Sequence, residues 1–150
     1  MSISSAPSTV GATSVEFVRL TLHRHTLRST AIRQAVLTML LESSYALSGS
    51  EIEKQIVPCT DRITLYRTLR IFEEKGLVHR VIDHCDIVRY AASSPAPAPA
   101  HVHFKCTTCR RLYCLHEVIV PPVELPALYH TSSSDYLLSG VCATCHPQEK

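Results

Sequence analysis

Apolar side chains in the first part of the chain recur every three or four residues, the spacing of a helix with one buried face. This pattern predicts one helix over 15–25 and a stronger one over 30–42. The segment Ser48-Gly-Ser-Glu51 matches a capping box, in which serine and glutamate side chains each bind a free backbone N–H. It predicts a short third helix over about 49–56, which ends before Pro58.

A fourth helix is predicted to begin after an N-cap at Thr60 or Asp61 and to end at Gly76. Leu65, Leu69 and Phe72 form its buried stripe, and its polar face carries Arg62, Tyr66, Arg67 and Arg70. A helix that binds in the major groove of DNA needs long donors on its exposed face, so this helix is predicted to read DNA. An ordinary charged surface helix has a similar pattern.

Beyond Gly76 the spacing of apolar residues becomes that of strands. Strands are predicted over 77–82 and 87–90, with a polar turn at 83–86. Helices followed by such a hairpin predict a winged helix-turn-helix, in which Arg80 or Arg89 of the wing would contact the DNA backbone.

The segment 91–100, AASSPAPAPA, contains three prolines and predicts a semi-rigid spacer rather than a helix or a regular strand. Short strands are predicted beyond it, over 101–104, 112–115 and 136–141. The predicted fold class is α+β. The predicted parts are a flexible tail (1–14), a winged-helix DNA-binding domain (15–90), a hinge linker (91–100) and a small, mostly β dimerisation domain (101–150).

Composition and charge narrow the class of protein. The chain has 150 residues, 45% of them hydrophobic, which is enough for a core, and no apolar run reaches the roughly 20 residues of a membrane helix. No secretory signal is visible at the N-terminus, so a cytoplasmic location without membrane contact is expected. Positive charge is concentrated early in the chain, at Arg19, Arg24, Arg28 and Arg33. Such an excess suits a polyanion such as DNA, although it also suits a solvated helix face.

Two C-x₂-C pairs stand out among the seven cysteines. Cys106 with Cys109 and Cys142 with Cys145 have the spacing that lets four sulfurs converge on one zinc ion, and this predicts a structural zinc site with four cysteine ligands. Two redox pairs or coincidence are the competing interpretations. A region of about fifty residues needs such a metal or a partner subunit to fold. Cys59, Cys85 and Cys114 are left over, as small buried or incidental thiols.

In these motifs the chain resembles the ferric uptake regulator family of metal-responsive repressors, over roughly residues 17–146. The resemblance rests on Leu27-Arg28-x-Thr30-x-x-Arg33, Thr64-Leu65-Tyr66-Arg67-Thr68-Leu69, Gly76-Leu77-Val78-His79-Arg80-Val81, His101-x-His103-x-x-Cys106-x-x-Cys109 and Gly140-x-Cys142-x-x-Cys145.

The resemblance implies a homodimer that binds an operator of inverted-repeat type on double-stranded DNA. It assigns DNA contacts to Tyr66 and Arg67, and contacts with the DNA backbone to Arg19, Arg24, Arg28 or Arg33. Thr64 and Arg62, on the same helix as Tyr66, are further candidate DNA-binding residues. It also implies a second, regulatory divalent metal at the hinge, zinc or iron. His79, His101 and His103 are the ligands that this sequence offers for it.

Several family ligands are replaced in this sequence. Ala46 stands where relatives carry a histidine, and Cys114 stands where they carry a glutamate. The ligand after the last wing strand is replaced by the stretch 91–94. The possible substitutes are His116, Glu117, Cys85 and Cys114. A hinge without a sensor metal, where the histidines only form hydrogen bonds, is the competing interpretation.

The sequence thus predicts a metal-dependent transcriptional regulator, a repressor of metal-uptake or metal-homeostasis genes, with no catalytic residues and no small-molecule substrate. A thiol-redox or metal-independent regulator of the same fold is one alternative. A zinc-dependent hydrolase built on the three histidines is the alternative from a different class, and it lacks a placed general base.

Overall fold

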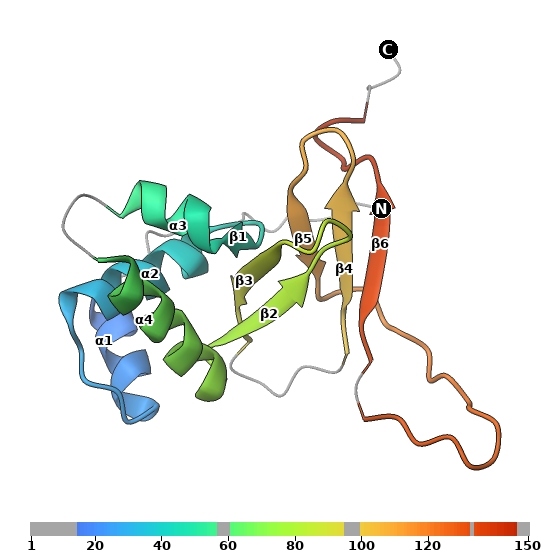
Figure 1. The fold of residues 1–150 in the computed structure, drawn as a ribbon, viewed down its shortest axis with the longest axis horizontal. Helices are drawn as coiled ribbons and strands as arrows, with labels where there is room; N and C mark the ends of the chain where they lie inside the picture. The colour runs from blue at the N-terminus through green and yellow to red at the C-terminus, as the bar shows by residue number, and fades with distance from the viewer. Residues whose placement is uncertain (1–14, 57–60, 95–99, 133, 147–150) are drawn as a thin grey trace, which may run out of the picture.

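The computed structural model describes residues 15–56, 61–94, 100–132 and 134–146 as two adjoining lobes (Figure 1). The helical lobe holds the helices and the wing, and the second lobe is a small sheet that carries the cysteine pairs. The predicted α+β fold class is confirmed. The tail 1–14, residues 95–99 of the predicted linker, Thr60 and Cys59 lie outside the described residues.

The four helices begin and end within two residues of their predicted bounds. The helices are α1 (Val15–Arg24), α2 (Ala31–Glu42), α3 (Gly49–Gln55) and α4 (Arg62–Glu74). Ser48 and Glu51 form the capping box of α3, and Asp61 caps α4 by accepting the Thr64 N–H. After α4, Gly76 has a φ of 71°, the left-handed conformation that favours glycine.

The core of the helical lobe lies between the four helices and the wing. Its largest fully buried side chain is Phe72 of α4, which packs with Leu65 and Leu69 of the same helix, as predicted. The wing consists of β2 (Val78–Ile82) and β3 (Val88–Ala92), and a two-residue strand β1 (Leu47–Ser48) pairs with β3. The order in this sheet is β1-β3-β2, all antiparallel.

Strand β3 extends the wing beyond its predicted end. Ala91 and Ala92 pair with His79 and Val78, so the first two residues of the predicted linker are regular strand. The prediction that 91–100 contains no regular strand is therefore wrong for these two residues. The prolines that suggested a spacer come later, at 95–99.

The second lobe is a three-stranded sheet. Strand β4 (Val102–Cys106) lies at its centre, antiparallel to β5 (Leu112–Leu115) and parallel to β6 (Tyr136–Gly140). A long irregular arm joins β5 to β6 and projects from the sheet (Figure 1). Its apolar residues are exposed, and Ile119 and Leu128 have 90% and 94% of their surface accessible.

The two lobes are in direct contact. The backbone N–H of Ala46 donates to the carbonyl of Leu112 at 2.8 Å, and around this bridge Ala46, Val81 and Leu112 form a small buried cluster. Because the first two residues belong to the helical lobe and the third to the second sheet, this cluster is a true interface between lobes. None of the helices in the described part of the chain is long and apolar enough to cross a bilayer.

Candidate metal centres and nucleic-acid interface

The two C-x₂-C pairs converge at one end of the second sheet. One ligand atom from each of Cys106, Cys109, Cys142 and Cys145 lies within 4.8 Å of the others. The Cys109 and Cys142 sulfurs are 3.8 Å apart. Sulfurs that bind a tetrahedral zinc at about 2.3 Å are about 3.8 Å apart, so this spacing matches that geometry and is far too long for a disulfide.

Backbone hydrogen bonds and shifted thiol pKa values make this cluster suitable for binding a cation. The Cys106 sulfur accepts the N–H groups of Cys109 and Cys142, at 3.5 and 3.4 Å. Burial raises the pKa of Cys106, but these hydrogen bonds outweigh it and lower the pKa to about 6. Its neighbour Cys145 has a pKa raised to about 12, mainly by its hydrogen bond with Cys142. Four adjacent thiols cannot all ionise unaided, and a Zn²⁺ ion supplies the charge that four thiolates require.

A second cluster joins the two lobes. It consists of His79 on β2, His101 directly before β4, His103 on β4, and Cys114 on β5, with one ligand atom of each within 4.8 Å of the others. The Nε2 atoms of His79 and His103 are 3.3 Å apart, and the Cys114 sulfur is 3.5 Å from His79 Nε2. Three imidazoles and one thiol around one point form a donor set that Zn²⁺ prefers.

The histidine rings of this cluster suit metal binding in their hydrogen bonding and in their charge. Among the described residues, His101 Nε2 and His103 Nδ1 are buried side-chain atoms with no hydrogen-bond partner. A buried polar atom without a partner costs free energy, and a metal ion bound to it would remove that cost. Burial, and then the neighbouring imidazoles, lower the pKa of His79 and of His103 to about 4, so both rings are neutral at pH 7. Neutral imidazoles can bind a metal without first losing a proton.

Sequence reasoning left the fourth donor open among several residues. Cys114 is next to His103 in the β4–β5 register, and this pairing brings it into the cluster. The ring of His116 is 4.3 Å from that of His101, but His116 and Glu117 are exposed and outside the set of four. Cys85 is exposed in the wing turn. The sequence signal for Cys114 is its place on the predicted strand 112–115, and its pairing with the strand of His103 is known only from the structure.

Helix α4 presents the predicted polar face. Arg62, Tyr66, Arg67 and Arg70 are exposed and, with Ile63, line one shallow surface. The guanidinium of Arg62 lies 5.7 Å from the centre of the Tyr66 ring, a cation–π contact, and 3.7 Å from a Glu53 oxygen. Thr64 lies in the first turn of α4, and its hydroxyl donates to the Asp61 carboxylate at 2.6 Å.

Gly49 of α3 lies close to the exposed polar face of α4. A Cβ atom at this position would lie 2.7 Å from Cζ of Tyr66, which is too close for two carbons. The position of Tyr66 on α4 therefore depends on glycine at the start of α3.

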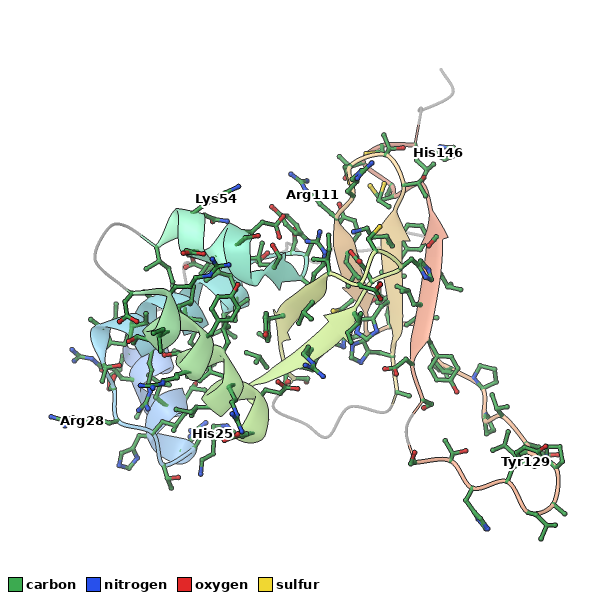
Figure 2. The ribbon with its side chains drawn as sticks, in the orientation of Figure 1. His25, Arg28, Lys54, Arg111, Tyr129 and His146 are labelled. Carbon is green, nitrogen blue, oxygen red and sulfur yellow. The ribbon has the colours of Figure 1, made fainter. Side chains whose placement is uncertain are left out.

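The early basic residues have different surroundings. Arg28 is exposed and projects into solvent (Figure 2). The guanidinium of Arg33 turns back and donates to the carbonyl of Arg28 at 2.9 Å. Arg19, His23 and Arg28 line a hollow next to the turn between α1 and α2.

The prediction that Arg89 of the wing contacts DNA is wrong. Arg89 is 7% exposed, and its guanidinium donates to Glu51 at 2.9 Å and to Asp83 at 3.3 Å. Arg89 points inward from β3, and its charge can be buried there because the carboxylates of Glu51 and Asp83 neutralise it. Arg80, the other predicted wing residue, is exposed and paired with Glu73 at 3.5 Å.

Known proteins resemble this chain over nearly its whole length. A sequence model described as the ferric uptake regulator family matches residues 24–124. The ferric uptake regulation protein of Bacillus subtilis (strain 168) is 24% identical over 143 residues, covering 90% of this chain and 96% of its own.

Solved structures share the fold. A zinc uptake regulator complexed with zinc and DNA superimposes with a TM-score of 0.63 at 17% identity, covering 87% of this chain and 91% of its own. The Helicobacter pylori ferric uptake regulator, described as having three functional metal-binding sites, gives 0.59 at 18% identity, covering 91% and 97%.

Proposed function

Because this chain belongs to the ferric uptake regulator family, we propose that it is a metal-dependent, DNA-binding transcriptional regulator that acts as a homodimer. We propose further that it represses genes of metal uptake or metal homeostasis and has no catalytic role. The observation that carries this proposal is the cluster of three histidines and one cysteine drawn from both lobes. A ligand bound there would fix how the DNA-binding lobe sits on the rest of the protein.

His79, His101, His103 and Cys114 would hold the regulatory ion. A divalent ion would supply positive charge and a fixed tetrahedral arrangement of ligands. His79 belongs to the wing and the other three to the second sheet, so this arrangement would restrain the two lobes relative to each other. The thiol among the donors favours zinc over iron or manganese, because soft sulfur ligands select against metals that prefer oxygen.

Helix α4 would enter the major groove of an operator. Tyr66, Arg67 and Arg62 are exposed on one face, as readout of base edges requires. Thr64 would contribute mainly by fixing the start of the helix, since its hydroxyl is bound to Asp61. Arg28, and Arg33 beside it, would contact phosphates. Two such lobes in a homodimer suit an operator of inverted-repeat type.

The second sheet would pair with its copy in the dimer. Its four converging cysteines would hold a structural zinc ion, which a lobe of this size needs. The exposed apolar residues of the arm, with Leu138 of β6 at 55% exposure, offer surface that a partner would cover.

DNA affinity with and without metal tests the proposal. A duplex is first selected from a random library with the zinc-loaded protein, and its affinity is then measured by fluorescence anisotropy at fixed salt. Zinc should raise the affinity of the wild type by about 5- to 150-fold, the usual range of coupling between two sites. The double change His101→Ala with His103→Ala should abolish this response and leave the zinc of the four cysteines in place.

His130→Ala is the matched control, because His130 is exposed on the arm, away from the cluster. It should respond to zinc like the wild type. A zinc response that survives the double change would show that the regulatory site is elsewhere. Failure of the wild type to select any duplex would overturn the proposal that the protein is a DNA-binding regulator.

A further inference from the structure

The face of β2 that meets the second sheet has three kinds of side chain in a row. His79 and Val81 alternate along the strand and so lie on one side of it, and Asp83 follows directly after the strand. His79 belongs to the metal cluster, and Val81 packs in the small apolar cluster with Ala46 and Leu112. Asp83 stands at the far end, where the wing turn lies against the β4–β5 hairpin (Figure 1).

The carboxylate of Asp83 is fully buried and accepts hydrogen bonds from both lobes. One oxygen accepts the backbone N–H groups of Cys85 and Ile87, at 2.9 and 3.1 Å, and so closes the wing turn. The other accepts Arg89 at 3.3 Å and, from the second lobe, the ammonium of Lys105 at 2.7 Å. The side chain of Asp83 has 0% and that of Lys105 12% of its surface accessible.

Lys105 stands on the same face of β4 as His103, two residues away. One strand therefore presents a metal ligand and an ammonium group to the same face of the wing. The ion pair needs no metal to form.

The pair continues into the DNA-binding lobe. Arg89 joins Asp83 to Glu51, and Glu51 also accepts the N–H of Ser48 in the capping box of α3. Gly49 follows Ser48 and lies against Tyr66 of α4. Ion pairs and packing thus connect the second sheet to the recognition helix.

We propose that the Asp83–Lys105 ion pair is a positioning contact that forms without metal. It holds the helical lobe against the second sheet and so preorganises the cluster of three histidines and Cys114. Lys105 supplies the second positive charge for the two carboxylates that Arg89 alone leaves half neutralised. A buried carboxylate that loses a partner is strongly disfavoured, so the closed arrangement of the lobes depends on Lys105. The consequence for metal binding rests on the proposed function, whereas the effect on the lobes does not.

Amide hydrogen exchange measures this contact directly. The N–H of Ala46 is bonded to Leu112 across the interface, and Ala46 is fully buried, so its exchange requires the lobes to separate. Lys105→Met keeps the aliphatic stem and removes the charge. In protein treated with a chelator to remove weakly bound metal, it should speed exchange at Ala46 by about ten- to a hundred-fold, the loss expected for a charged hydrogen bond.

Three comparisons make the result specific. The amide of Leu69, in the core of the helical lobe, should exchange as in the wild type, since opening between lobes does not unfold this core. Lys105→Arg should restore slow exchange at Ala46. Lys54→Met removes a lysine exposed on α3 (Figure 2) and should change nothing.

Equal exchange at Ala46 in Lys105→Met and the wild type would overturn the proposal, as would equal acceleration at Ala46 and Leu69. Co²⁺ serves as the metal probe in a separate arm, and it should slow exchange at Ala46 in the wild type. If Co²⁺ has no effect there while Lys105→Met still accelerates exchange, the regulatory metal site fails and the positioning contact stands.

Discussion

Metal binding to the cluster of three histidines and Cys114 should release one proton, and this proton should come from Cys114. Burial raises the pKa of this thiol to about 11, so it is protonated at pH 7. A metal binds the thiolate, so binding must expel the proton. Apparent affinity should therefore rise about ten-fold per pH unit from pH 7 up towards the thiol pKa.

His79 and His103 should add nothing to this pH dependence above about pH 5, and His101, whose pKa burial also lowers, should add nothing above its ordinary value of about 6.5. An ordinary histidine, with a pKa near 6.5, would compete with metal below that pH. Here the pKa of His79 and of His103 is about 4, lowered by burial and then by neighbouring imidazoles, so both are neutral before binding. The slope should stay at one proton between about pH 6.5 and 8, and it should steepen less below pH 6.5 than it would with three ordinary histidines.

Calorimetric titration with Zn²⁺ in two buffers of different ionisation enthalpy counts the protons. The wild type should release about one proton from the hinge site, whereas Cys114→Ser should bind more weakly and release none. The titration is done on protein that keeps the zinc of its four cysteines. Release of no proton by the wild type, or an unchanged count in Cys114→Ser, would refute the assignment of Cys114 as the fourth ligand.

Three further changes test other parts of the protein. Cys106→Ser should release about one zinc per chain and dissociate the dimer, as measured by metal analysis and sedimentation; retained zinc would contradict the four-cysteine site. Arg67→Ala should weaken operator binding by about 1–3 kcal/mol at unchanged zinc content, and equal affinity would remove Arg67 from the interface. Gly49→Ala should displace the exposed Tyr66 ring, because the new Cβ overlaps the far end of that ring, and should therefore weaken operator binding more than it changes the melting temperature. Operator affinity equal to that of the wild type would contradict this packing argument.

The helices could be predicted because their signals are local. The capping box at Ser48 and Glu51, the cap at Asp61 and the glycine at 76 each act over a few residues, and all are found as predicted. Strand β1 could not be predicted, because two residues carry no period and exist as a strand only through pairing with β3.

The site could be predicted in its ligand types but not in all its partners. C-x₂-C spacing is a local signal, and so is the alternation that puts His101 and His103 on one face. The inward orientation of Arg89 could not be predicted, since a charged residue on a wing strand is usually exposed and its partner Glu51 is 38 residues away. Cys114 was one of several possible donors until the register of β4 and β5 was known.

The origin of the hinge donors in two separate lobes has a consequence for the cell. If operator DNA and the ion both favour the same arrangement of the lobes, each must tighten the other by an equal factor. A promoter-bound copy would then keep its ion at concentrations where a free copy has lost it. The operator-bound copy would lose its ion at a free-metal concentration that is lower than for the unbound copy by the same factor with which the ion strengthens DNA binding.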